Sequence, residues 1–309
     1  MPGTWLCSRS VRLVTTEAQA RAYLDGTLDR LGVRTGDRIM LGIDMSGIPL
    51  PHYRAALTRD AFRERERQWC GFVLQALRDR LGRAGTLLVP AFSYSCGRPG
   101  STFVAETTPS EVGPFPEFVR VQPDAIRSVH PIFSLAGLGQ DAGALLGDVG
   151  RSAFGSRSPF ARFAAAGIRF LCLGVELRNC ITYIHHLEQM YGCPHRFHKS
   201  FDSRVTVEGR EWSGDWYAYV GYRGLDYTSD ITTLQDALRG VGALAEADWN
   251  GRVNHLAEIS AVDAAGYQLL SVDAGAFLNR RLSLRFEEPV GASEARSDRS
   301  TMVIEDIRR

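Results

Sequence analysis

The apolar positions of the chain follow two different periods. Segments with an apolar spacing of three to four residues predict helices, and short apolar runs bounded by Gly or Pro predict strands. The predicted helices cover 16–32, about 60–82, 158–167, about 230–240 and 263–281. The predicted strands cover 36–44, 86–92, 133–139 and 169–175. Because strands that alternate with helices pair in parallel, the pattern predicts an α/β fold with a mainly parallel central sheet.

The pattern changes after Lys199. Two short alternating runs, RVTVEG at 204–209 and WYAYVGYRG at 216–224, predict a small antiparallel excursion in the C-terminal third. The last segment, 288–309, is charged and has few core residues, so we expect a single domain over 1–287 and a polar, flexible tail. Residues 93–116 are rich in Gly, Pro, Ser and Thr, and a loop of that length usually serves binding.

Charge and cysteine usage narrow the function classes. The chain has 36 Lys plus Arg and 35 Asp plus Glu, so no global field attracts nucleic acid or an anionic membrane. No apolar run approaches membrane-spanning length, and the first residues lack the features of a secretory leader. The six cysteines include no CxxC pair, which favours reduced thiols. We therefore expect a cytoplasmic protein that binds neither nucleic acid nor membrane.

The most informative stretch follows the strand predicted at 169–175. Thr182, His185 and Glu188 are spaced by three, so on a helix they share roughly one face. Ligands of open α/β sheets bind at the carboxyl ends of strands, where this helix would begin. A carboxylate beside an imidazole can fix its tautomer and raise its basicity, which suits a general base near neutral pH. The alternative interpretation is a helix packed on the sheet, with His185 satisfied in the core or paired with Glu188 only for stability.

A second group of polar residues lies just before the strand predicted at 133–139. Arg127, Ser128 and His130, with free backbone amides, could bind phosphate or amide groups, although a turn stabilised by Ser and Pro explains the same pattern. The chain has no GxxxxGK[ST], GxGxxG, GxSxG or HExxH motif. Kinase, dinucleotide-binding and serine hydrolase functions are therefore disfavoured, and no metal is expected.

Four blocks of sequence stand in a characteristic order along the chain. They are GDRIML (36–41), TTPSEVGPFPEFVR (107–120) running into RSVHPIFSLAGLG (127–139), FGSRSPFARFAAAGIRFLCLGV (154–175), and NCITYIHHLEQ (179–189) with RFHKSF (196–201). Together they resemble the aminoglycoside 3-N-acetyltransferase family, also called the antibiotic N-acetyltransferase superfamily. The HHLEQ and RFHKSF segments are closer to the branch found among biosynthesis genes than to resistance enzymes.

The resemblance implies an αβα sandwich that binds acetyl-CoA. It identifies Thr182, His185 and Glu188 with a TxxHxxE motif whose His and Glu activate the acceptor amine. It also implies that the block around Ser128, Val129 and His130 lines the coenzyme site, with Ser110 in a TPS turn. The chain departs from resistance enzymes at 42–47, where GIDMSG replaces a segment like VHSSL and leaves no His near Ile43.

We therefore expect a CoA-dependent N-acyltransferase with His185 as general base and Glu188 as its orienting partner. The donor is acetyl-CoA or another acyl-CoA, and the acceptor is a small-molecule amine of an amino sugar, an aminoglycoside-like compound or a natural product. The basic stretch 193–199 favours an anionic acceptor. The predicted coenzyme-binding residues are Ser110, Arg127, Ser128, Val129 and His130, and the predicted substrate-binding residues are Asp44, Thr182, Arg196 and Lys199. For Thr182 we expect helix capping in preference to substrate contact.

Several alternatives stay open. The missing motif His near Ile43 would suit a ligand-binding module that has lost catalysis. Cys172, Cys180 and Cys193 lie close to the expected site along the chain, so a cysteine-dependent or metal-dependent hydrolase is a further alternative. A homodimer and an acyl carrier protein as donor also remain open.

Overall fold

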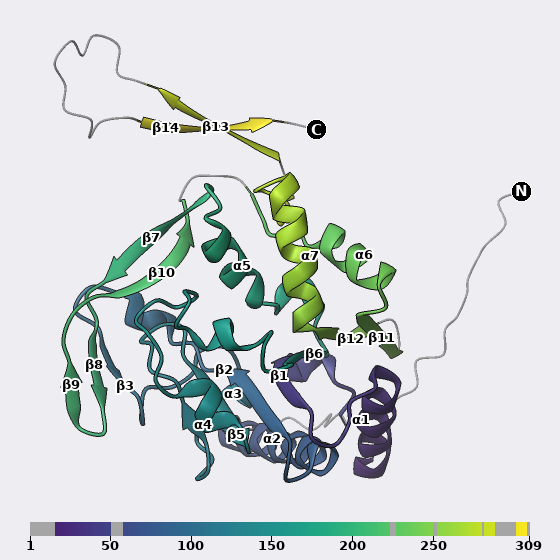
Figure 1. Cartoon of the computed structure of the whole chain (residues 1–309). Coiled ribbons are helices and arrows are strands. Elements are labelled where there is room, and N and C mark those ends of the chain that lie inside the picture. The colour runs from purple at the N-terminus through teal and green to yellow at the C-terminus, as the bar shows by residue number, and fades with distance from the viewer. Residues whose placement is uncertain are drawn as a thin grey trace, which may run out of the picture.

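A seven-stranded sheet forms the centre of the computed structural model, which describes residues 16–50, 58–222, 227–249, 252–279, 281–287 and 301–307 (Figure 1). Its strands are β1 (Arg38–Ile43), β2 (Thr86–Pro90), β4 (Ile126–Arg127), β5 (Leu135–Gly139), β6 (Arg169–Leu173), β11 (Leu244–Trp249) and β12 (Arg252–Glu258). The strand order is β11-β12-β6-β1-β2-β5-β4, in which β6, β1 and β2 pair in parallel. Antiparallel strands flank this parallel centre on both sides. Antiparallel pairing therefore extends further than the sequence predicted, because β4 and β5 also pair in this way.

Helices cover both faces of the sheet. They are α1 (Glu17–Leu31), α2 (Arg59–Leu81), α3 (Pro114–Arg120), α4 (Ala142–Leu146), α5 (Tyr183–Tyr191), α6 (Thr232–Gly240) and α7 (Ile259–Val272). Successive strand residues point to opposite faces, so Leu41 and Leu171 pack in the core under α1, α2 and α3. Met40 and Phe170 pack in the other core, under α4 to α7. The predicted α/β fold, an αβα sandwich, is confirmed.

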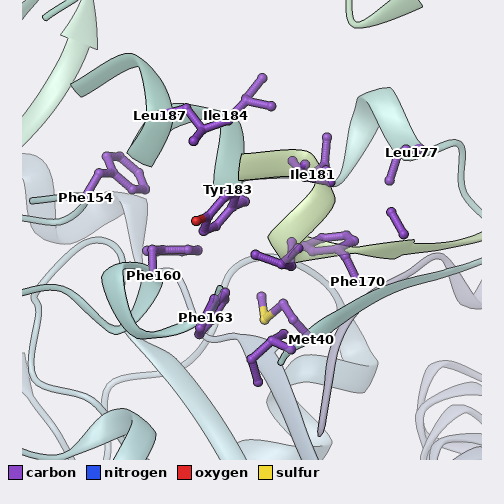
Figure 2. Close-up of a cluster of buried hydrophobic side chains, with 14 of the residues drawn as sticks. Met40, Phe154, Phe160, Phe163, Phe170, Leu177, Ile181, Tyr183, Ile184 and Leu187 are labelled. Atoms are coloured by element: carbon purple, nitrogen blue, oxygen red, sulfur yellow. The ribbon is translucent and has the colours of Figure 1, made fainter. Parts of the chain in front are cut away.

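The second core holds α5 against the sheet. Figure 2 shows Tyr183, Ile184 and Leu187 of this helix above an aromatic cluster, and all three are buried. The cluster consists of Phe154, Phe160, Phe163 and Phe170, each at most 1% exposed. Burial of large apolar side chains contributes about 1.5–3 kcal/mol each, so this face of α5 is firmly attached.

Three predicted segments differ from the observed ones. The helix expected at 158–167 is only the 3-10 turn η3 (Pro159–Arg162), followed by turns up to Gly167, which is left-handed with φ 65°. The helix expected at 263–281 covers Ile259–Val272 and ends where Asp273 is extended. The long loop at 93–116 contains η2 (Tyr94–Gly97), the short strand β3 (Thr102–Val104) and the first turn of α3.

The predicted antiparallel excursion is confirmed. It consists of β7 (Arg196–Phe201), β8 (Arg204–Val207), β9 (Arg210–Trp212) and β10 (Trp216–Gly221). β7 pairs with β10, and β8 pairs with β9. β8 also pairs in parallel with β3, which ties the excursion to the long loop.

Two further strands, β13 (Arg281–Glu287) and β14 (Thr301–Ile307), pair antiparallel beyond α7 (Figure 1). The predicted tail at 288–309 falls partly here, and its residues 288–300 and 308–309 lie outside the described residues. The division into one domain over 1–287 and a flexible tail stays a prediction. Within the described ranges, no helix is both long and apolar enough to cross a bilayer.

The close approach of two glycines at the carboxyl ends of β1 and β6 generates a stability prediction. A Cβ built on Gly47, in the turn η1 (Met45–Gly47), would overlap the backbone carbonyl of Gly174. Gly47→Ala should therefore lower the free energy of unfolding by about 2 kcal/mol or more in urea denaturation. The matched control is Gly240→Ala, where a Cβ meets no atom within 4 Å and the change should stay within about 1 kcal/mol. Equal effects at both positions would contradict the overlap.

Candidate functional site

The chain leaves β6 through the 3-10 turn η4 (Leu177–Asn179) and enters α5 at Thr182. Thr182 occupies the N-cap position, but its side chain makes no capping hydrogen bond. Its hydroxyl instead donates to the carbonyl of Cys180 at 3.4 Å. The predicted capping role is therefore wrong, and substrate binding by Thr182 stays a prediction.

His185 and Glu188 face each other across one turn of α5. The distance from Nδ1 of His185 to Oε2 of Glu188 is 2.8 Å. Because a carboxylate can only accept, Nδ1 carries a proton, and in the neutral tautomer the lone pair is on Nε2. No group in the described part of the chain hydrogen-bonds Nε2. The His185 side chain keeps 26% exposure, so an incoming ligand can reach Nε2.

Glu188 is the centre of a larger network. Its side chain is 1% exposed, and Nε2 of the buried His195 donates to Oε1 at 3.0 Å. Nε of Arg196 lies 2.8 Å from Oε2 and forms an ion pair that is not aligned as a hydrogen bond. Arg196, predicted to bind substrate, is therefore engaged with Glu188. His195 was not predicted from the sequence.

A chain reversal brings His195 to Glu188. α5 ends at Gly192, which has φ 82°, and the N–H of Cys193 donates to the carbonyl of Glu188 at 2.9 Å. Glycine adopts this left-handed conformation without penalty. The chain then turns back alongside the helix and starts β7 beside the carboxylate.

The network keeps Glu188 ionised. Burial by itself would raise the pKa of this carboxyl, but hydrogen bonds from His185 and His195 and the charge of Arg196 outweigh burial and hold its pKa at about 2. The positive charge of Arg196 faces the negative charge of Glu188 at 2.8 Å. A neutral imidazole beside a fixed carboxylate is the state that a general base requires.

A row of aromatic rings leads from the surface to His185. Tyr94, which is 53% exposed, lies 6.1 Å from Phe133, and Phe133 lies 5.0 Å from Phe154. Phe154 meets the imidazole of His185 edge-on at 5.5 Å. Nδ1 of His186 donates to the carbonyl of Phe154 at 2.7 Å, so His186 positions this row from inside the protein. The row gives the site one apolar wall.

Most polar groups of the predicted coenzyme block are used inside the protein. The five guanidinium N–H groups of Arg127 donate to the carbonyls of Ala91, Ala105 and Thr108 and to the hydroxyls of Ser93 and Ser134. Burial lowers the pKa of Arg127 to about 10, so it stays charged near neutral pH. The hydroxyl of Ser128 accepts from the N–H of Leu135, and Val129 packs on a small apolar cluster.

His130 is also satisfied internally. Its Nδ1 accepts the N–H groups of Ile132 and Phe133, so Nε2 carries the proton and donates to the carbonyl of Tyr217 at 3.2 Å. Burial lowers its pKa to about 4. The hydroxyl of Ser110 differs, because it is buried and has no partner in the described residues. Coenzyme binding by this block stays a prediction. The side chains of Arg127, Ser128 and His130 make hydrogen bonds that stabilise the conformation of the block itself.

Two predicted substrate-binding residues lie away from the dyad. Asp44 lines a separate cleft of about 570 Å³ with Gly174, Arg252 and His255, and neither His185 nor Glu188 borders it. Lys199 is exposed, and its ammonium lies 5.0 Å from the ring centre of Phe201. Side chains alternate along β7, so Lys199 and Arg196 project from opposite faces of the strand. The structure thus joins His185, Glu188 and Arg196, but not Asp44 or Lys199.

Metal and cysteine chemistry find little support in this site. The described residues contain no group of three or more His, Cys, Asp or Glu side chains suited to a metal ion. Cys193 is fully buried near Glu188, and burial raises its pKa to about 12. Its thiol therefore stays protonated near neutral pH, which does not favour a nucleophilic role.

Comparisons with known proteins give one consistent result. A sequence profile described as aminoglycoside 3-N-acetyltransferase matches residues 68–266. Aminoglycoside N(3)-acetyltransferase VII of Streptomyces paromomycinus is 30% identical over 62% of this chain and 68% of its own length, and enzyme VIII of Streptomyces fradiae shows the same values. The solved structure of AAC-IIIb in binary complex with CoASH shares the fold, with a TM-score of 0.62 and 23% identity over 82% of this chain and 96% of its own.

Because Glu188 is buried and ionised, its contribution to stability should depend on pH. Glu188→Gln should lower the free energy of unfolding at pH 7 by about 3 kcal/mol, because Gln leaves the half-buried Arg196 without its counter-charge. The pKa of Glu188 in the folded chain, about 2, is below its ordinary value of 4.5. Its contribution is therefore complete above pH 4.5 and is lost as the pH falls through about 2.

The difference in Tm between wild type and the Gln variant should accordingly narrow as the pH falls from 4.5 toward 2. Thermal unfolding of both proteins in buffers between about pH 2 and pH 7 measures this difference in Tm. The control is Glu211→Gln, at an exposed position of β9, where Tm should barely change. A difference as large at about pH 3 as at pH 7 would show that the ionised state is not what stabilises the fold.

Proposed function

The chain belongs to the aminoglycoside 3-N-acetyltransferase family and is an acyltransferase, and from this premise we propose that it acetylates an amine of an aminoglycoside or related amino sugar in the cytoplasm. Acetyl-CoA is the proposed donor. The observation that carries the proposal is the unpaired Nε2 of His185, which is held as a base by the ionised, buried Glu188.

The reaction joins an amine to a thioester. An alkylammonium ion has no lone pair, so the amine must enter neutral or lose its proton in the site. Its nitrogen attacks the acetyl carbonyl carbon while Nε2 of His185 accepts an N–H proton. The tetrahedral intermediate then expels the sulfur of CoA, which leaves as a thiol with the proton from His185. The reaction needs no covalent acyl-enzyme.

The neighbours of His185 have distinct roles in this scheme. Glu188 holds the ring in the tautomer that leaves Nε2 free and stabilises the imidazolium that forms. His195 and Arg196 position Glu188 from β7 and the turn before it, so they act through the carboxylate. Neither is proposed to touch the reacting atoms.

Donor and acceptor are supported by different observations. The related fold of AAC-IIIb was solved with CoASH, and the aromatic row of Tyr94, Phe133 and Phe154 offers an apolar surface beside the base. The names of the two Streptomyces relatives point to aminoglycosides as acceptors. The expectation of an anionic acceptor depended on the basic residues at 193–199. Because Arg196 is paired with Glu188, it is not free to bind an anionic group, and this expectation is weakened.

Amine dependence is the first test of this function. With acetyl-CoA and an aminoglycoside, free CoA thiol should appear together with the N-acetylated product. With acetyl-CoA alone, thiol release should stay at the rate of spontaneous hydrolysis, because no water is activated productively. Thiol detection and mass spectrometry of the product measure both arms. Equal thiol release with and without the amine would indicate a thioester hydrolase instead.

The second test concerns the base. His185→Ala should lower kcat by about 100-fold to 10,000-fold, the usual contribution of general-base catalysis. Thermal shift with acetyl-CoA should still report binding, since His185 is not proposed to hold the donor. The matched control is His186→Asn, which keeps a donor toward the carbonyl of Phe154 and should change kcat only a few-fold. Wild-type turnover in His185→Ala would exclude this residue as the base.

A further inference from the structure

Two cysteines outside the dyad lie in direct contact. Cys172 is on β6, and Cys180 follows η4, three residues before the start of α5 at Tyr183. Their Sγ atoms are 2.7 Å apart and both are free thiols. The sulfur atoms of a disulfide are about 2.05 Å apart, so only a small movement separates this pair from a covalent bond.

The fold makes room for this contact at one glycine. Gly42 on β1 is the register partner of Cys172. A Cβ at Gly42 would lie 2.6 Å from Cβ and 2.8 Å from Sγ of Cys180. The missing side chain is therefore what allows Cys180 to lie on the sheet against Cys172.

The backbone around Cys180 keeps it in place. Its N–H donates to the carbonyl of Leu177 at 3.1 Å, and its own carbonyl accepts from the N–H of Thr182 at 2.8 Å. The contact with Cys172 is therefore built into the connection from β6 to α5, and it does not depend on a loosely held side chain.

The two thiols have different access to solvent. Cys172 is fully buried, and burial raises its pKa, so it stays a thiol. Cys180 is only half-buried and can be reached from outside. Susceptibility to oxidation follows exposure and thiolate character, so Cys180 is the residue that an oxidant meets first.

We propose that Cys172 and Cys180 form a thiol-oxidation site that closes to an intramolecular disulfide in the presence of a hydroperoxide. The thiolate of Cys180 attacks an oxygen of the peroxide, the O–O bond breaks, and the released hydroxide leaves as water, which makes Cys180 a sulfenic acid. The sulfur of Cys172 then attacks Sγ of Cys180, the S–O bond breaks, and hydroxide leaves with the proton of Cys172 as water. Two thiols are oxidised and hydrogen peroxide is reduced to two waters.

The disulfide ties the end of β6 to the segment that leads into α5. It closes the loop between residues 172 and 180 and crosses no catalytic contact, because neither sulfur touches His185 or Glu188. A covalent link across a short loop stabilises the folded chain mainly by restricting the unfolded one. Oxidation should therefore raise the stability of the protein.

The experiment treats the reduced full-length protein with hydrogen peroxide and then counts thiols in denaturant. Oxidised protein should show two fewer thiols than the six of the reduced chain, and dithiothreitol should restore them. Tryptic mass spectrometry should find a linked pair, because cleavage at Arg178 separates the two cysteines. Tm should rise by about 2 °C or more on oxidation.

Three variants make the test specific. Cys180→Ser should abolish the linked pair and the rise in Tm. Cys193→Ser, which removes a buried thiol on the same tryptic peptide as Cys180, should retain both. Gly42→Ala should weaken disulfide formation by displacing Cys180. A wild-type chain in which Cys180 is overoxidised while Cys172 stays free, or in which other cysteines pair, would overturn the proposal.

Discussion

The site depends on a carboxylate that has almost no contact with water. Burying an ionised group costs several kcal/mol unless charges and hydrogen bonds compensate it, and Glu188 receives that compensation from α5 and from the start of β7. The helix supplies His185, and the returning chain supplies His195 and Arg196. The reversal at Gly192 and the position of β7 are therefore linked to Glu188. The hydroxyl of Tyr219 on β10 donates to the carbonyl of Cys193, which extends the link to the next strand.

Helix α5 has one face that packs on the core and another that carries the dyad. Tyr183, Ile184 and Leu187 face the aromatic core (Figure 2), while His185 and Glu188, within the same two turns, form the dyad. The sheet below is packed on both faces, since its strands alternate residues between two cores. The proposed base is thus attached to a helix that is packed on the core of the fold.

The sequence was informative where the determining contacts are local. Periodicity located the strands β1, β2, β5 and β6 and the helices α1, α2, α6 and, with shifted bounds, α7. A spacing of three within one helix was enough to predict that His185 faces Glu188. His195 was not predicted because it reaches Glu188 only after the chain reverses at Gly192, beyond the end of the helix, where helical periodicity no longer applies. Arg196 and Lys199 seemed to belong to one basic stretch, but a strand sends residues three apart to opposite faces. Asp44 could not be placed because its cleft is formed by segments far apart in sequence.

Polar residues near a site can face a ligand or satisfy buried backbone, and residue type alone does not distinguish the two. Arg127 directs three of its five donors to the long loop and the other two to Ala91 after β2 and to Ser134 before β5, so this largely buried cation organises a segment that has little regular structure of its own. His130 accepts the N–H of Phe133 and sets the backbone that carries a ring of the aromatic row. Buried charge therefore acts at two places: Glu188 orients His185, and Arg127 donates to Ser93 in the loop that bears Tyr94. Glu188 and the donors of Arg127 find their partners within the protein, which leaves Nε2 of His185 as the unpaired polar atom of the dyad.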